Sequence, residues 1–181
     1  RWGTWLSIGR ARITQNEGQR GADSRPDQTA QLELLSLHLK SGCHYGPLGS
    51  DSELRRLRRH QCQQLRRQRG ILEEWVDAQV TMGRPFVLAG DFNRQLDQPN
   101  DHFWNALDDG EVCQWRPHPE LGRQCLPGTA RPELGVRLSL AGAGQPFPFP
   151  LNPRYPYAID HILAGGLAAD WLVEGSYEVL S

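Results

Sequence analysis

The sequence predicts an α/β (α+β) domain, and three features carry that prediction. Residues 31–39 alternate in the manner of a strand, residues 54–82 carry apolar side chains at helical spacing, and residues 86–89 form a short apolar run after Pro85. A strand–helix–strand order is a crossover unit, which places its two strands parallel or near one another in one sheet. A chain of 181 residues can bury one sizeable core, so we expect a single domain over residues 1–181.

The composition fits a globular protein on the polar side of the usual range, with 38% hydrophobic and 23% charged residues. The net charge of −1 excludes an overall basic field that would draw the chain to nucleic acid or acidic membranes. All of the 20 basic residues but Lys40 are arginines, which we attribute to a GC-rich genome rather than to phosphate binding. No apolar run is long enough to span a bilayer.

The first half of the chain begins with a predicted strand at residues 2–9, followed by a polar loop or hairpin tip over residues 10–30. In the next strand, residues 31–39, alternate side chains face opposite sides of the sheet. His38 stands at the end of that strand. Taken alone, a histidine in this position is more often structural than catalytic.

The helix predicted over residues 54–82 has one apolar stripe, which comprises Leu54, Leu57, Leu65, Leu72, Trp75 and Val76. Asp51 or Ser52 can cap its start, and Gly83-Arg84-Pro85 ends it. Gly70 falls on the side away from the stripe. Seven arginines between Arg55 and Arg69 lie mostly on that side. We expect a solvated face there, and the alternative is a phosphate-binding stripe.

The second half is rich in glycine and proline and gives weaker signals. A strand is predicted over residues 157–164, where Asp160 is a carboxylate in an apolar run and so needs a partner, while His161 faces the opposite side and is interpreted as structural. The other expected features are a polar loop at 94–101, a short helix at 102–109 ended by Gly110, strands near 112–115 and 136–140, an ordered loop at 146–150 that can wall a cleft, and a last strand at 177–180.

The apolar strand at residues 86–89 runs into Gly90-Asp91-Phe92-Asn93. Gly90 allows a sharp turn or a close approach of another group. If the chain stays extended, Asp91 and Asn93 leave the same face and bring a carboxylate and an amide to the edge of the sheet. Such a pair can bind a hard cation, hold a water molecule or contact a phosphate. The alternative is an Asx turn that closes the strand.

Four cysteines, Cys43, Cys62, Cys113 and Cys125, permit two disulfides in three connectivities. Their spacings do not match a zinc site. Local pairing, Cys43 with Cys62 and Cys113 with Cys125, is the simplest interpretation, and four free thiols are the alternative. Disulfides would place the protein outside the cytoplasm, so we expect it to be secreted or periplasmic.

Three segments in this order resemble the endonuclease/exonuclease/phosphatase superfamily, the deoxyribonuclease I-like fold. They are His-Leu-Lys-Ser-Gly-Cys at 38–43, Gly-Asp-Phe-Asn-Arg at 90–94 and Ile-Asp-His-Ile-Leu at 159–163. The helix between the first two segments, together with the first cysteine pair, resembles a bacterial branch that is often exported. The resemblance covers essentially the whole chain and implies two β-sheets packed face to face, with flanking helices outside.

The resemblance also implies roles for four residues. His38 matches the histidine that contacts the scissile phosphate, and Asp91 and Asn93 match the pair that handles the attacking water and the phosphate or a metal. Asp160 matches the carboxylate that orients a second histidine. The implied activity is hydrolysis of a phosphodiester, in the manner of a nuclease, with Mg²⁺, or Mn²⁺ or Ca²⁺ in its place, as cofactor.

Two parts of the family pattern have no match in these residues: the principal metal-binding glutamate of an early strand, and the Ser-Asp-His motif that would begin at Ser181. We therefore expect an incomplete sandwich and little activity from residues 1–181 alone. The alternatives are a phosphomonoesterase, for which Arg94 and Arg154 are the candidate extra cations, a lipid phosphodiesterase, for which Phe147 and Phe149 offer apolar contacts, and a non-catalytic binding module. We expect a monomer.

Overall fold

The computed structural model describes residues 7–12, 31–46, 48, 59–143, 158–173 and 176–177. Its main sheet has the strand order β1-β2-β3-β7-β6, with β1 at Ser7–Arg12, β2 at Gln31–His38, β3 at Phe86–Asp91, β7 at Asp160–Gly165 and β6 at Leu138–Leu140. Strands β2 and β3 are parallel, which confirms the predicted crossover unit. The other neighbouring strands in this sheet are antiparallel.

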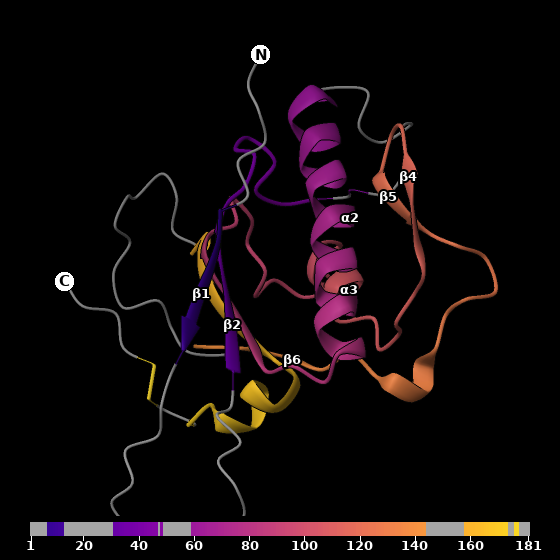
Figure 1. Ribbon diagram of the computed structural model, residues 1–181. Helices are drawn as coiled ribbons and strands as arrows, with labels where there is room; N and C mark the ends of the chain where they lie inside the picture. Colours follow the sequence, from indigo (N-terminus) through magenta and orange to yellow (C-terminus); the bar gives the residue numbers. More distant parts are fainter. Residues whose placement is uncertain are drawn as a thin grey trace, which may run out of the picture.

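Helix α2 (Arg59–Thr81) covers one face of this sheet (Figure 1). Alternate residues of β2 and β3 point toward it, so Leu35, Phe86 and Leu88 are fully buried. The Trp75 ring of α2 meets the Phe86 ring edge to face, with ring centroids 5.4 Å apart. Burial of each such side chain contributes about 1.5–3 kcal/mol, and the interface between α2 and the main sheet is part of the hydrophobic core.

The C-terminal end of α2 follows the prediction. Gly83 adopts φ 63°, and the N–H of Arg84 donates to the carbonyl of Gln79 at 3.0 Å, which closes the last turn before Pro85. The predicted caps, Asp51 and Ser52, lie outside the described residues.

A second, two-stranded sheet lies on the other side of α2 (Figure 1) and consists of β4 (Trp115–His118) and β5 (Gly122–Cys125). A Cβ on Gly70 would lie 2.6 Å from the carbonyl oxygen of Leu121, so the helix and this hairpin approach closely. Arg66 is 5% exposed and lies 3.7 Å from the Glu120 carboxylate. The expectation that the Gly70 side of the helix faces solvent was therefore wrong.

Both predicted disulfides are present. Cys43–Cys62 ties the loop after β2 to α2, and Cys113–Cys125 ties the two sides of the hairpin together. The hairpin is also attached to the helix by Asp77, whose Oδ2 accepts from the Cys113 N–H at 2.8 Å and from the Trp115 indole N–H at 2.7 Å.

Two carboxylates on α2 are poorly hydrated. Burial raises the pKa of Glu73 to about 7, against the opposing effect of the Arg69 guanidinium 2.9 Å away. Burial also raises the pKa of Asp77 to about 6, although its two hydrogen bonds lower it. Asp109 adds negative charge to both. Glu73, Asp77 and Asp109 thus form an acidic cluster next to the hairpin, away from the ends of β2 and β3.

Three short helices complete the described fold: α3 (Trp104–Leu107), η1 (Pro132–Leu134) and η2 (Gly166–Trp171). Helix α3 confirms the short helix expected before Gly110. The strand expected at 112–115 is wrong by three residues and is replaced by β4, and the strand expected at 136–140 is shorter, as β6. The expected features at 2–6, 146–150 and 178–180, and most of the loop at 10–30, lie outside the described residues.

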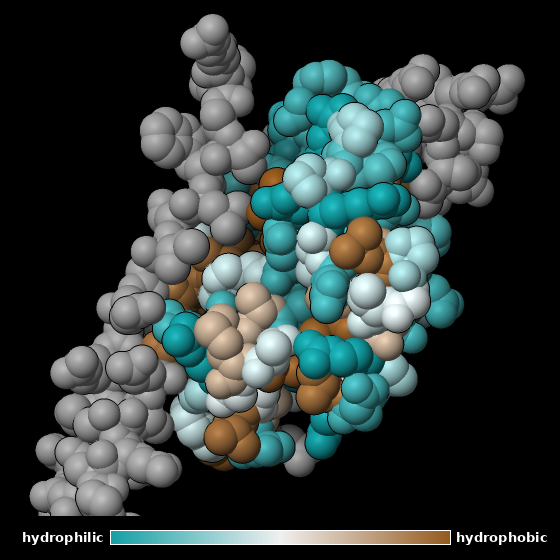
Figure 2. Space-filling view, turned by 45° about the vertical axis from the view of Figure 1, so that its right-hand side comes forward, coloured by the Kyte–Doolittle hydropathy of each residue, from teal (hydrophilic) through white to brown (hydrophobic). Residues whose placement is uncertain are grey.

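The two sheets and the helices give the predicted α+β class, with α2 between the five-stranded sheet and the hairpin (Figure 1). Figure 2 shows hydrophilic residues gathered over the upper part of that view and hydrophobic residues mainly over its lower part. Exposed hydrophobic side chains include Leu134 and Leu167, which are 39% and 58% exposed. Among the described residues, no helix is both long enough and apolar enough to cross a membrane.

Candidate functional site

Three of the predicted site residues form one row across the main sheet. His38 in β2 is the register partner of Asp91 in β3, and Asp91 is the register partner of Asp160 in β7. Strands β2 and β3 end at the same edge because they are parallel, and β7 starts there because it runs the other way. The sheet thus brings together residues that are 53 and 69 positions apart in the sequence. We call these three residues the strand-end row.

The strand-end row is open to solvent on the His38 side. The His38 side chain is 80% exposed, that of Asp91 is 30% exposed, and His38 Nε2 lies 3.7 Å from Asp91 Oδ2. This separation is an ion-pair distance and is too long for a hydrogen bond. Both groups therefore remain available to contact a bound molecule.

Gly90 makes the approach of β2 and β3 possible just before the row. Its φ is 135°, a conformation that other residues avoid, and a Cβ there would lie 2.2 Å from the carbonyl oxygen of Leu37. The predicted close approach at Gly90 is thus confirmed, and the approaching group is the backbone of β2.

Asn93 does not share a face with Asp91, because the chain stops being extended after β3 and Asn93 adopts φ 51°. Its N–H donates to Asp91 Oδ1 at 2.7 Å, which is the Asx turn named as the alternative. Its side-chain Nδ2 donates to the carbonyl of Leu39 at 2.9 Å, and the residue is 4% exposed. Of the two predicted metal ligands, Asp91 faces the open edge and Asn93 is buried behind it.

Asp160 starts β7 and is exposed, so the expectation of a charge inside an apolar strand was wrong at this point. Partial burial raises the pKa of the Asp160 carboxyl, and the neighbouring Asp91 carboxylate raises it further. Exposure to solvent limits the strength of both effects. No hydrogen bond or ion pair joins this carboxylate to another residue in the described part of the chain.

His161 points to the opposite face, as predicted for a structural residue. It is 7% exposed, and its ring packs against the Phe92 ring with the ring centroids 5.8 Å apart. Its Nε2 donates to the carbonyl of Arg94 at 2.8 Å. Burial lowers the pKa of this imidazole and so favours its neutral form. His161 thus holds the backbone of Arg94, the residue after Asn93, from the buried face of the sheet.

Arg94 is not a substrate-contacting cation, which corrects the suggestion that it could serve a phosphomonoesterase. It is 1% exposed, and its guanidinium pairs with Asp101, with Nη2 2.6 Å from Oδ2. Sequence reasoning missed this buried pair. Its one local signal is Asp101 itself, which stands before the short helix α3 and accepts from the N–H groups of Phe103 and Trp104.

The ability of the row to hold a metal can be judged from its oxygen atoms. A hard cation such as Mg²⁺ prefers carboxylate and water oxygens in a six-coordinate shell. Asp91 Oδ2 and the exposed Asp160 carboxylate fit part of such a shell, whereas Asp91 Oδ1 is engaged by Asn93. Among the described residues, no group of three or more His, Cys, Asp or Glu side chains is placed to hold an ion.

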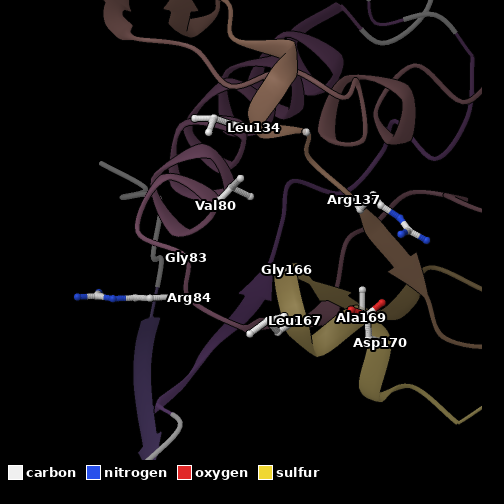
Figure 3. A pocket seen from close by; sticks show the side chains of 10 residues that line it. Val80, Gly83, Arg84, Leu134, Arg137, Gly166, Leu167, Ala169 and Asp170 are labelled. Atoms are coloured by element: carbon white, nitrogen blue, oxygen red, sulfur yellow. The ribbon is translucent and has the colours of Figure 1, made fainter. Parts of the chain in front are cut away.

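A surface pocket away from the strand-end row is a less suitable site for phosphate chemistry than the row itself. It lies at the opposite end of the sheet from the row, between the end of α2 and η2. Its lining is largely apolar, from Val80, Leu134 and Leu167, and the side chains of Arg84 and Arg137 point away from it (Figure 3).

The described residues form an α+β domain in which a histidine and two carboxylates meet at one open edge of the main sheet. The family model described as Endonuclease/Exonuclease/phosphatase family matches residues 11–177. The chain belongs to this family, whose members in general hydrolyse phosphate esters. Searches of curated proteins and of solved structures returned no match.

Proposed function

We propose that the protein hydrolyses phosphodiester bonds by attack of an activated water, in the manner of a nuclease and with a divalent cation such as Mg²⁺ as cofactor. The strand-end row supports this proposal most directly, because it places an ionisable carboxylate and an exposed imidazole at the same open edge. The cation, when bound, neutralises charge on the phosphoryl oxygens and the leaving group.

Asp91 is proposed to orient the attacking water and take its proton. One carboxylate oxygen, Oδ1, is held by the Asn93 N–H, which leaves Oδ2 as the oxygen that faces His38 and the open edge. A general base needs both a fixed direction and an ionised carboxylate at working pH. The Asx turn therefore serves the proposed chemistry, and Asn93 acts on Asp91 from behind.

His38 is proposed to donate a hydrogen bond to a non-bridging phosphate oxygen, where negative charge develops during attack. Its high exposure fits a group that meets substrate. Asp160, beside Asp91 in register, is proposed to orient a second histidine, as the resemblance implies, and to add negative charge that favours a cation. We propose Asp91 and Asp160 as the described residues that would touch that cation.

The substrate is proposed to be a diester rather than a monoester. A monoester carries a second negative charge and calls for additional cations near the phosphate. Arg94, one of the two candidates for that role, is buried and neutralised by Asp101. The other candidate, Arg154, and the apolar residues Phe147 and Phe149 that would suit a lipid substrate lie outside the described residues.

The two disulfides are compatible with an extracellular location, and we propose a secreted or periplasmic protein that acts as a monomer.

The test is Mg²⁺-dependent hydrolysis of bis(p-nitrophenyl) phosphate by the protein, compared with hydrolysis of p-nitrophenyl phosphate. Asp91→Asn should lower kcat for the diester by about 10²-fold or more, because it removes the base. Asp97→Asn is the matched control, since it changes an exposed carboxylate in the loop that follows β3, outside the strand-end row. Near-normal turnover by Asp91→Asn would refute the assigned role, and no diester hydrolysis by the wild type would refute the proposed function.

A further inference from the structure

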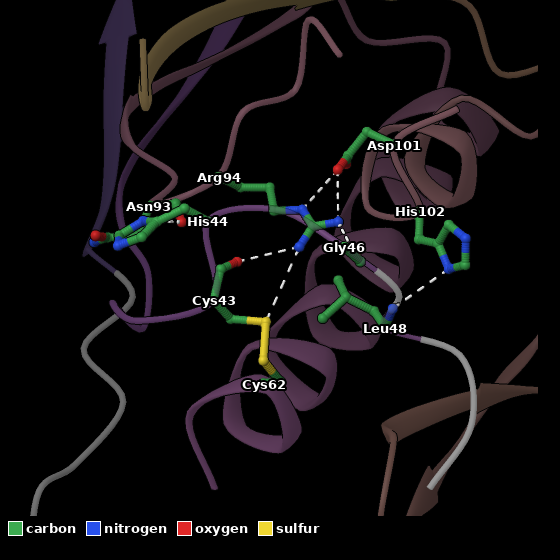
Figure 4. Close-up of a disulfide and its surroundings, with 9 residues drawn as sticks. All are labelled: Cys43, His44, Gly46, Leu48, Cys62, Asn93, Arg94, Asp101 and His102. Carbon is green, nitrogen blue, oxygen red and sulfur yellow. Dashed lines mark hydrogen bonds and ion pairs between the residues drawn. A yellow bond between two sulfur atoms is a disulfide. The ribbon is translucent and has the colours of Figure 1, made fainter. Parts of the chain in front are cut away.

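Two loops meet behind the strand-end row. The post-β2 loop comprises residues 39–46, and the post-β3 loop comprises residues 92–103. The guanidinium of Arg94 lies between them (Figure 4). Its Nε donates to Asp101 Oδ2 at 2.7 Å within the post-β3 loop, and its Nη1 donates to the carbonyl of Cys43 at 3.1 Å across the gap. Its Nη2 donates to the carbonyl of Gly46.

The contacts with the post-β2 loop continue on either side of Asn93. The His44 ring Nδ1 lies 3.0 Å from the Asn93 carbonyl, the Gln95 N–H donates to the His44 carbonyl at 2.9 Å, and the Asn93 side chain donates to the Leu39 carbonyl at 2.9 Å. Asn93 has a left-handed conformation, which asparagine tolerates better than most residues, and these bonds hold it there. The post-β2 loop therefore supports the conformation of Asn93 from both sides.

Arg94 has two possible reasons to be buried. The first is stability, but a buried ion pair is often replaced by apolar residues of similar volume without loss of stability. The second is geometry, because a planar guanidinium can bind a carboxylate and two carbonyl oxygens in fixed directions, which no apolar side chain can do. Its bonds to the Cys43 and Gly46 carbonyls favour the geometric reason.

We propose that Arg94 is a positioning residue for Asp91: by holding the post-β2 loop against the post-β3 loop, it keeps the Asn93 N–H on Asp91 Oδ1 and so aims Asp91 Oδ2 at the open edge. The inference rests on the proposed function for the meaning of Asp91. The effect passes through backbone and hydrogen bonds, and Arg94 itself does not touch the substrate.

The test variant is Arg94→Met combined with Asp101→Asn, which removes both charges, keeps most of the buried volume and leaves Oδ1 as acceptor for the Phe103 and Trp104 N–H groups. The matched control is Arg123→Gln with Glu74→Gln, because that pair, 2.7 Å apart, joins α2 to the hairpin away from the row. If the first double variant does not fold, Arg94→Lys takes its place, since a single ammonium keeps the charge but not the planar fork.

The first readout is amide hydrogen exchange by NMR. In the test variant the Asn93 and Gln95 amides should exchange at least about tenfold faster than in the wild type, while the Leu35 and Leu88 amides of the core change by less than about twofold. The control double variant should leave Asn93 unchanged. Unchanged protection of Asn93 in a folded test variant would overturn the inference.

The second readout is Mg²⁺-dependent hydrolysis of bis(p-nitrophenyl) phosphate. The test variant should lose at least about tenfold in kcat with KM within about threefold, because the base is misdirected while the substrate contacts remain. An unchanged kcat would also overturn the inference. If the wild type hydrolyses no diester, the proposed function fails, and the Asn93 exchange result alone then decides whether Arg94 sets the loop geometry.

Discussion

Replacing Gly90 by alanine should separate β2 from β3 next to the strand-end row. Gly90 is the register partner of Leu37 in β2, one position before His38 and Asp91. An added Cβ would lie 2.2 Å from the Leu37 carbonyl oxygen and 3.1 Å from its carbonyl carbon and nitrogen. These are backbone atoms of a paired strand, so the contact cannot be relieved by a side-chain rotation.

The expected cost has two parts. Alanine at φ 135° is strained by about 1–3 kcal/mol, because that region is populated almost entirely by glycine. Relief of the contact requires the strands to move apart, and the loss of one or two strand hydrogen bonds adds about 1 kcal/mol each. The sum, about 2–5 kcal/mol, is a large fraction of the ~5–15 kcal/mol by which domains are usually stable.

The assay is urea unfolding followed by circular dichroism, with Gly83→Ala as the matched control. Gly83 also has a positive φ, 63°, but a Cβ there meets no atom within 4 Å. The control should lose only about 1 kcal/mol from backbone strain. The reasoning is refuted if Gly90→Ala unfolds at the same urea concentration as Gly83→Ala, because the two variants differ chiefly in the contact with Leu37.

Three further predictions concern α2 and its attachments. The folded pKa of Glu73, about 7, lies above its ordinary value of 4.5, so its contribution to stability is complete below pH 4.5 and is lost as the pH rises through 7. Glu73→Gln should therefore reduce the change in unfolding free energy between pH 5 and pH 8 by about 3 kcal/mol, and an unchanged pH dependence would contradict this. Asp77→Ala leaves the Trp115 indole N–H and one backbone N–H without their acceptor and should cost about 2–4 kcal/mol with a shift in tryptophan emission, whereas unaltered emission and stability would show that water replaces the carboxylate. Removal of the Cys43–Cys62 bridge with serines opens a 19-residue loop and should lower the unfolding free energy by about 3 kcal/mol, and a loss below about 1 kcal/mol in chemical denaturation would indicate that the reduced chain is already constrained.

Two members of the strand-end row, His38 and Asp91, were predictable because each is a polar residue at the end of an apolar strand. The crossover unit implies that residues 31–39 and 86–89 end at one edge of the sheet, and this depends on periodicity and chain direction alone. Asp160 joined the row through the resemblance, and the structure places it in register with Asp91. Its exposure shows that the argument from an unpaired buried charge was unnecessary.

Asn93 was harder to predict because an Asx turn and an extended chain have the same sequence pattern. The outcome depends on the Leu39 and His44 contacts, which come from a loop more than 45 positions away. Arg94 shows the same limit. A surface arginine and a buried one look identical in the sequence unless the partner loop is known.

The helix face around Gly70 was predicted to be solvated because its residues are polar. The covering hairpin is short and polar, and its approach to the helix uses backbone atoms against a glycine rather than an apolar stripe. The one available signal was Gly70 itself, since a glycine inside a helix weakens it and often has a packing reason.

The row depends on two separate supports, and they should fail differently. Strand register sets where the Cα atoms of His38, Asp91 and Asp160 lie, so a change at Gly90 moves the residues of β2 and β3 relative to each other. The direction of the Asp91 carboxylate depends instead on the Asn93 N–H and on the loops that Arg94 joins. A register defect should therefore weaken both substrate contact and turnover, whereas a loop defect should lower kcat and leave KM nearly unchanged. This difference between the Gly90 and Arg94 variants follows from the geometry of the row, because His38 belongs to the strand support alone while Asp91 depends on both.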